Sequence, residues 1–199
     1  MKLSEARRDQ YRRLAQKKGY VSRAAFKLEQ LHRKYRLLKQ GDVVIDLGCS
    51  PGGWLQVTSD IVGSQGLVVG VDLVEAKVCG KNIKILIDSV HSEQLPKSIL
   101  DVVPRKADVI LSDLSPKITG VWEVDQARQA DLTKRALELA TKLLRGGGSA
   151  VLKVFDGEMF LQVRESAENA FKVVRVAKPP ASRASSSEVY LVCSGFRSQ

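Results

Sequence analysis

The chain alternates between short apolar runs and longer segments in which apolar residues recur every three or four positions. Short runs rich in Val, Ile and Leu are typical of buried strands, and the longer periodic segments are typical of amphipathic helices. This alternation predicts an α/β fold in which a mostly parallel, seven-stranded sheet carries helices on both faces. Strands are predicted at 43–46, 67–71, 83–87, 107–113, 150–155, 172–177 and 188–193, and helices at 4–18, 22–35, 54–62, 96–104, 124–144 and 157–170.

The last predicted strand differs from the others in how the chain reaches it. The connection at 178–187 is rich in proline and serine and contains no helical segment. A right-handed crossover between parallel strands needs a longer connection, so this strand is predicted to run antiparallel to its neighbours. The long helix before the fifth strand is expected to stop at the glycine run 146–148.

The turn after the first predicted strand is rich in glycine and leads into a helix. Its order is Gly48-x-x-x-Gly52-Gly53, which matches neither the G-x-G-x-x-G turn of dinucleotide-binding proteins nor a P-loop. The second and third strands end in Asp72 and Asp88, where carboxylates can accept hydrogen bonds from ribose hydroxyls. A ligand with an adenosine but no diphosphate fits this pattern, which indicates S-adenosyl-L-methionine rather than NAD.

Charge is distributed unevenly along the chain. Residues 1–40 contain thirteen Lys or Arg and three Asp or Glu, whereas the other 159 residues contain nineteen of each sign. The whole formal net charge of +10 therefore lies in one N-terminal block, which favours a polyanionic partner, most plausibly a nucleic acid. No apolar run is long enough to span a membrane, and the block lacks the apolar stripe of a membrane-lying helix. We therefore expect a cytoplasmic protein without a membrane partner.

The length of 199 residues predicts a single domain, with residues 1–40 as a basic helical extension and 41–199 as the α/β core. The three cysteines form no C-x-x-C pair and have no histidine at metal-ligand spacing. Neither a metal site nor a disulfide framework is therefore expected.

Two ionisable residues lie near the carboxyl ends of later strands, where ligands bind in sheets of this kind. Asp113 ends the fourth strand, and Lys153 interrupts an apolar strand that should be interior. A buried lysine is costly without a partner or a function, so Lys153 is predicted to be functional. The chain has neither the Pro-Pro-aromatic turn of enzymes that methylate amines nor the Pro-Cys nucleophile of those that methylate base carbons.

Five motifs together resemble the FtsJ/RrmJ family of ribosomal RNA ribose 2′-O-methyltransferases, from about residue 10 to the end of the chain. They read Ser-Arg-Ala-Ala-Phe-Lys27, Asp-Leu-Gly-Cys-Ser-Pro-Gly-Gly-Trp54, Ser-Asp113-Leu-Ser-Pro, Leu-Lys153-Val-Phe-Asp-Gly-Glu and Ser-Ser-Glu188-Val-Tyr. The resemblance implies a Rossmann-like S-adenosylmethionine-dependent methyltransferase fold. It implies a catalytic tetrad of Lys27, Asp113, Lys153 and Glu188, with Lys153 as the key base. It also implies cofactor contacts from Gly48, Gly52, Gly53, Trp54, Asp72, Asp88 and Asp113.

The resemblance further implies an RNA partner, with a uridine of large-subunit ribosomal RNA as the expected target and a monomer as the expected state. Relatives of the same fold methylate tRNA or mRNA caps, so a tRNA 2′-O-methyltransferase is an alternative. A non-catalytic RNA-binding protein and an NAD-dependent oxidoreductase are further alternatives, which the intact tetrad and the glycine spacing disfavour. Lys27 would lower the pKa of Lys153, whereas Asp113 and Glu188 would raise it. Which effect is larger stays open at this point.

Overall fold

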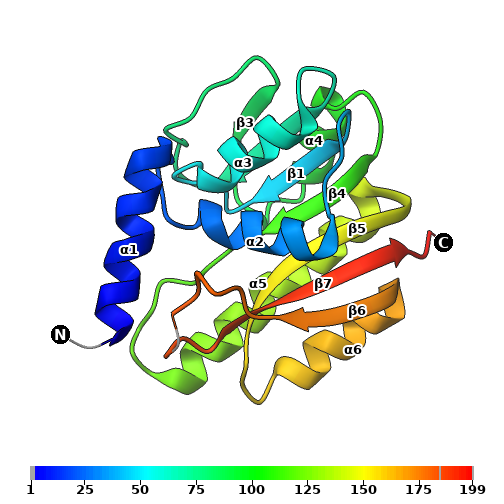
Figure 1. Cartoon of the computed structure of the whole chain (residues 1–199). Helices are drawn as coiled ribbons and strands as arrows, with labels where there is room; N and C mark the ends of the chain where they lie inside the picture. The colour runs from blue at the N-terminus through cyan, green and yellow to red at the C-terminus, as the bar shows by residue number, and fades with distance from the viewer. Residues whose placement is uncertain (1–2, 184, 199) are drawn as a thin grey trace.

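The computed structural model describes residues 3–183 and 185–198, with side chains from residue 10 onward. Within this part of the chain, seven strands form one sheet in the order β3-β2-β1-β4-β5-β7-β6 (Figure 1). Strand β7 is antiparallel to β5 and β6, and the other pairs are parallel, so the predicted sheet and its antiparallel last strand are confirmed. The strands are β1 Val43–Leu47, β2 Leu67–Asp72, β3 Ile83–Ile87, β4 Ala107–Ser112, β5 Leu144–Phe155, β6 Phe171–Ala177 and β7 Glu188–Phe196.

Helices cover both faces of the sheet (Figure 1). One face packs against α4, α5 and α6 through a large apolar cluster that includes Ile99, Leu139 and Val163. The other packs against α2 and α3 through a second cluster that includes Leu28 and Leu55. The helices are α1 Leu3–Lys18, α2 Ala25–Tyr35, α3 Gly53–Val62, α4 Leu95–Val102, α5 Trp122–Leu143 and α6 Phe160–Ala170.

The junction between α5 and β5 differs from the prediction. The helix ends at Leu143, and the glycine run 146–148 lies inside β5 rather than stopping the helix. Ala107 pairs with Leu144 and Val109 pairs with Ser149, so the register shifts across the glycines. Glycine tolerates this irregularity because it has no side chain to place, and a glycine-rich sequence alone does not distinguish a bulged strand from a turn.

The two N-terminal helices attach to the core in different ways. Helix α2 packs on α3 and the sheet through buried residues that include Ala25, Leu28 and Leu31. Helix α1 joins a smaller cluster in which Ala15 packs with Phe26 of α2 and with Ala181 of the β6–β7 connection. The two N-terminal helices and the connection before β7 therefore lie next to one another.

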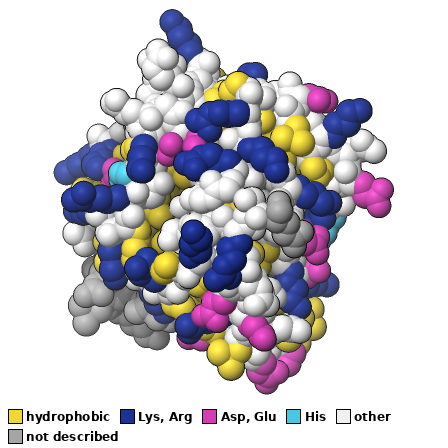
Figure 2. Space-filling view, turned by 90° about the vertical axis from the view of Figure 1, so that its right-hand side faces the viewer, with side chains coloured by type: hydrophobic (Ala, Val, Ile, Leu, Met, Phe, Trp, Pro, Cys, Tyr) yellow, Lys and Arg dark blue, Asp and Glu magenta, His cyan; other side chains and the backbone are white. Residues whose placement is uncertain are grey.

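Exposed cationic side chains also occur outside the N-terminal block. Figure 2 faces the side of the molecule where β7 ends, and shows Lys and Arg side chains distributed over it among fewer acidic ones. At this edge of the sheet, the exposed cations Arg105, Lys106, Arg145 and Arg197 lie outside the block, and Lys39 lies near its end. No helix in the described ranges is long and apolar enough to cross a membrane. No group of three or more His, Cys, Asp or Glu side chains in those ranges could hold a metal ion.

Candidate active site

A cavity of about 300 Å³ opens at the carboxyl ends of β1, β2 and β4. Its lining includes Gly48, Asp72, Asp88 and Asp113, four of the residues that the sequence singles out. Gly48 has a φ of 78°, and a Cβ there would lie 3.0 Å from backbone atoms of Leu114. Only glycine fits that position without strain, so the turn can close under the cavity.

The lining combines carboxylates with apolar side chains. Asp72 accepts hydrogen bonds from the Ser50 and Val74 N–H groups, at 2.9 Å and 3.1 Å, which fix its carboxylate at the cavity wall. Asp88 accepts a bond from the N–H of Ser89 at 2.7 Å. Carboxylates suit ribose hydroxyls, and apolar walls suit the faces of an adenine ring. This combination of acceptor carboxylates and apolar walls fits S-adenosylmethionine, and Val71, Leu73, Val90, Leu114 and Leu132 would supply the apolar contacts.

Asp46 is a fully buried carboxyl in β1, two residues before Gly48. Neither of its oxygens has a hydrogen-bond partner among the described residues. Burial raises the pKa of Asp46 well above its ordinary value, and the nearby Asp113 and Asp72 raise it further. Three carboxyl groups therefore lie close together below and beside the cavity. A cationic ligand beside these groups would favour their ionised forms, which also suits a cofactor with a positively charged sulfur.

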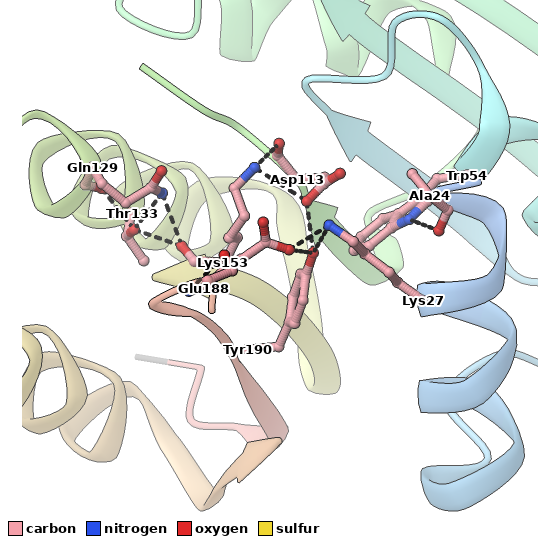
Figure 3. A network of polar contacts seen from close by, with 10 residues as sticks. Ala24, Lys27, Trp54, Asp113, Gln129, Thr133, Lys153, Glu188 and Tyr190 are labelled. Carbon is pink, nitrogen blue, oxygen red and sulfur yellow. Dashed lines mark hydrogen bonds and ion pairs between the residues drawn. The ribbon is translucent and has the colours of Figure 1, made fainter. Parts of the chain in front are cut away.

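Lys153 lies within β5, between β4 and β7, and is only 4% exposed. Its Nζ donates a hydrogen bond to the carbonyl oxygen of Asp113 at 2.6 Å and lies 3.2 Å from the Oδ1 atom of that residue (Figure 3). Asp113 thus belongs both to the cavity lining and to the environment of Lys153. The predicted interior position of this lysine is confirmed, and it is partnered rather than isolated.

The other two predicted tetrad members come from distant parts of the chain. Lys27 of α2 forms a short ion pair with Glu188, the first residue of β7 (Figure 3). Tyr190 connects this pair to the rest of the site. Its hydroxyl lies 2.7 Å from Glu188 Oε1, 2.8 Å from Asp113 Oδ1 and 3.3 Å from Lys27 Nζ. The structure therefore brings the four predicted residues into one network, with Tyr190 at its centre.

The pKa values of Glu188 and Tyr190 are shifted in opposite directions. Burial alone would raise the pKa of Glu188, but Lys27 and Lys153 lower it below its ordinary value. Burial raises the pKa of Tyr190 well above its usual value, and Asp113 and Glu188 raise it further. Tyr190 therefore keeps its single proton, which it can donate to only one of the two carboxylates at a time.

Helix α5 holds the strand segment that carries Lys153. Thr133 Oγ1 and Gln129 Nε2 donate hydrogen bonds to the carbonyl oxygen of Lys153, at 2.7 Å and 3.1 Å. Both side chains are almost fully buried. Polar side chains on the core face of a helix are expensive unless paired, so these two fix the backbone from which the lysine projects.

Comparisons with known proteins agree with this geometry. Residues 20–196 match the model of the FtsJ-like methyltransferase family. The chain belongs to that family. It is 42% identical to ribosomal RNA large subunit methyltransferase E of Cenarchaeum symbiosum, over 99% of this chain and 100% of that protein. It is 44% identical to the protein of that name from Methanococcus maripaludis strain C5, over 96% of this chain and 75% of that protein.

Solved structures extend the likeness to three dimensions. A ribosomal RNA methyltransferase of Plasmodium falciparum superimposes with a TM-score of 0.79 at 25% identity, over 90% of this chain and all of that chain. Fibrillarin of Aeropyrum pernix, crystallised with bound S-adenosyl-L-methionine, shares the fold with a TM-score of 0.59 at 16% identity, over 87% of this chain and 75% of that one. The present FtsJ-like methyltransferase uses S-adenosylmethionine as its methyl donor.

Three of the predicted cofactor residues do not line the cavity of this methyltransferase. A Cβ on Gly52 would lie 2.4 Å from a methyl group of Val78, and one on Gly53 would lie 2.3 Å from Ser22 Oγ. Trp54 is 3% exposed, and its indole N–H donates to the carbonyl oxygen of Ala24 at 2.9 Å. In the described structure these residues pack α3 against its neighbours.

Sequence reasoning missed Asp46 and Tyr190 in this FtsJ-like methyltransferase. Asp46 carries the same signal as Lys153, an ionisable residue in an otherwise apolar strand, and that signal could have identified it. Tyr190 carries no such signal, because a tyrosine in a strand is ordinary. Only the pairing of β7 with β5, which places Tyr190 opposite Lys153, reveals its position.

Proposed function

We propose that this methyltransferase methylates a ribose 2′-hydroxyl of large-subunit ribosomal RNA, with a uridine as the target nucleotide. The observation that carries the proposal is the position of Asp113, which lines the cofactor cavity and also contacts Lys153. A hydroxyl that reaches the Lys153 amine at this point would lie next to the methyl donor. S-adenosylmethionine, when bound, supplies a methyl group on a positively charged sulfur.

The contacts of Lys153 support its role as the base. To act as the base, Lys153 must first release the proton that gives it the charge acting on Glu188, and the neutral amine then has two N–H groups and one lone pair. Asp113 offers two acceptors to this amine, its carbonyl oxygen and its Oδ1 atom. With both N–H groups directed to Asp113, the lone pair is left to accept the proton of a 2′-hydroxyl. The reaction then ends with a methylated ribose oxygen, a demethylated cofactor and a protonated Lys153.

Lys27, Glu188 and Tyr190 support this step by position and charge. Glu188 stays ionised beside Lys27, so the pair is close to neutral overall. Asp113 then contributes one negative charge beside the amine and the cavity. Fixed groups of this kind stabilise charge in a transition state without reorganising during the reaction.

Substitution of Lys153 tests the proposal. Lys153→Ala should bind S-adenosylmethionine and RNA but transfer methyl groups roughly 10²–10⁴-fold more slowly. Lys153→Arg should be almost as slow, because a guanidinium is effectively never deprotonated. Lys142→Ala removes an exposed lysine of α5 and should behave as wild type. A near-normal single-turnover rate for Lys153→Arg would exclude proton transfer to this residue.

The assay uses methyl-labelled cofactor with large ribosomal subunits and, separately, with tRNA. Ribose methylation removes the hydroxyl that alkaline hydrolysis requires, so the labelled nucleotide should survive in an alkali-resistant dinucleotide. Label in a base, or label only in tRNA, would contradict the proposed target. We further propose that the enzyme acts as a cytoplasmic monomer without a membrane partner, and that residues 1–40 form an RNA-binding extension of a catalytic core at 41–199.

A further inference from the structure

An aromatic pair lies at the rim of the site, beyond Lys153. Trp122 is the first residue of α5, and its ring stacks on Phe155, with ring centroids 6.0 Å apart and an angle of 16° between the planes. Phe155 is the last residue of β5 and pairs across the sheet with Glu188. Successive residues of a strand alternate between the two faces of a sheet. Phe155 therefore follows Lys153 on the same face, directly opposite one member of the tetrad.

The Trp122 ring is held in place although it is 41% exposed. A Cβ at Gly157 would lie 3.0 Å from the indole ring, so the backbone of residue 157 borders it closely. Asp125 fixes the first turn of α5, because it accepts hydrogen bonds from Thr119 N and Gly120 N at 2.8 Å and 3.1 Å. Gln126 accepts another from the N–H of Glu158 at 2.9 Å. The ring therefore rests on a rigid base.

The chain segment that carries Trp122 exposes several apolar side chains. Ile118, Val121 and Val124 are 59%, 52% and 39% exposed, and all belong to the connection after β4 or to the first turn of α5. The same segment carries two exposed cations, Lys117 and Arg128, and one exposed carboxylate, Glu123. An exposed aromatic and apolar surface with nearby cations matches a single strand of nucleic acid, which offers base faces and phosphates together.

We propose that Trp122 is a stacking platform for an unpaired base of the RNA substrate, beside the nucleotide whose ribose reaches Lys153. This inference rests on the proposed RNA substrate and adds a specificity: the target region must be single-stranded or splayed open when it binds. Stacking tolerates any base, because every base has a π face. The platform thus selects for accessibility of the RNA rather than for sequence.

A binding cycle with paired changes in protein and RNA tests the proposal. The probes are a nine-nucleotide oligouridylate and the same oligomer with abasic riboses, titrated at one fixed salt concentration. Trp122→Leu should weaken binding of oligouridylate by roughly 5- to 150-fold, the range that corresponds to stacking of one base on an aromatic side chain. The same variant should bind the abasic oligomer less than about twofold more weakly than wild type, since no base is left to stack.

Two further variants sharpen the result. Trp122→Phe retains an aromatic face and should recover most of the affinity. Leu161→Ala removes an apolar side chain of α6 that is 71% exposed, and should bind both oligomers as wild type does. Tryptophan fluorescence gives an independent readout because the other tryptophan, Trp54, is buried. Oligouridylate should quench the wild-type signal and leave that of Trp122→Phe almost unchanged.

Equal losses of affinity for the two oligomers in Trp122→Leu would overturn the proposal, because they would assign Trp122 a structural role. Absence of quenching in the wild type would also overturn it. Both measurements are made without methyl transfer. Failure of the proposed function, such as methylation of a base instead of a ribose, would therefore appear in the alkali-resistance assay and not in this cycle.

Discussion

At the scale of single residues, the buried Lys and Asp side chains in the described ranges divide into those with partners and one without. Lys27 and Lys153 are each paired with a carboxylate. Asp46 has no partner among the described residues. The sequence could predict that Lys153 is buried, because its strand is otherwise apolar, while its function stays a prediction. It could not predict which groups surround each side chain, because those partners come from positions as far apart as Lys27 and Glu188.

Asp46 should make the protein without bound cofactor less stable as pH rises. Its pKa is raised in the folded state, mainly by burial, so the folded protein binds this proton more tightly than the unfolded chain does. The resulting stability is complete below the unfolded pKa of about 3.9 and is lost as pH rises toward the folded value. Asp46→Asn removes this ionisation. Each kcal/mol by which the substitution increases the free energy of unfolding at neutral pH should raise the melting temperature by about 2–4 °C.

The measurement is thermal unfolding of wild type and Asp46→Asn between about pH 4 and pH 8, a window that begins near the ordinary carboxyl pKa. The difference between the two proteins should grow with pH. Asp60→Asn, a change at an exposed carboxylate of α3, controls for net charge and should show no such trend. A lower melting temperature for Asp46→Asn throughout this range would mean that the carboxylate stabilises the fold.

At the scale of elements, the order and type of the strands follow from their apolar runs, and so does the direction of β7. The predictions fail where backbone pairing overrides local composition. The glycine run 146–148 is the main case, because pairing with β4 draws it into β5. Sequence reasoning also did not single out Asp108, a carboxylate that joins the beginnings of three strands.

Asp108 should be a stability determinant with a characteristic pH dependence. Its oxygens accept hydrogen bonds from Val43 N at 2.8 Å and Arg145 Nε at 2.6 Å, and Arg105 pairs with it at 2.6 Å. It thus links the beginnings of β1, β4 and β5. Burial alone would raise the pKa of Asp108, but Arg145, the Val43 N–H group and Arg105 lower it below its ordinary value.

We expect Asp108→Asn to lower the free energy of unfolding at neutral pH by about 1–3 kcal/mol. A carboxylate with a lowered folded pKa contributes stability above the unfolded pKa of about 3.9, and that contribution disappears as pH falls through the folded value. Urea unfolding at neutral and acidic pH should therefore show a difference that shrinks on acidification. Asp101→Asn, an exposed position of α4, is the matched control. A pH-independent difference would contradict the role of ionisation.

At the scale of the whole molecule, the two N-terminal helices carry excess positive charge and pack against elements that contribute to the site. Helix α2 brings Lys27 into the tetrad, and α1 packs beside the connection before β7. On α1 the residues Arg12, Arg13 and Lys17 are exposed, whereas Ala15 packs inward. Three other basic residues of the N-terminal block, Lys2, Arg7 and Arg8, lie outside the part of the chain whose side chains the structure describes.

Reversal of the exposed charges on α1 should weaken RNA binding. In the triple variant Arg12→Glu, Arg13→Glu, Lys17→Glu, the slope of log affinity against log salt should fall by roughly 0.7 for each lost phosphate contact with single-stranded RNA. Affinity for S-adenosylmethionine should not change, because the described residues that line the proposed cofactor cavity include none of α1. The measurement is RNA binding at several salt concentrations.

The matched control reverses three exposed lysines outside the N-terminal block, Lys97, Lys142 and Lys172, and so makes the same change in net charge. If both variants lose the same amount of salt dependence, the effect comes from total charge and α1 holds no RNA contact. A slope that changes only in the α1 variant locates phosphate contacts on that helix.

The position of β7 has a consequence for synthesis of the protein. This strand is inserted between β5 and β6, both made before it, and it begins with Glu188. A chain emerging from the ribosome in sequence order therefore leaves one edge of β5 and both edges of β6 unpaired until β7 arrives. Until then it also lacks Glu188 and Tyr190, so the network around Asp113 is incomplete. The pairing of β7 with its two neighbours and the completion of the network around Asp113 therefore occur in the same step.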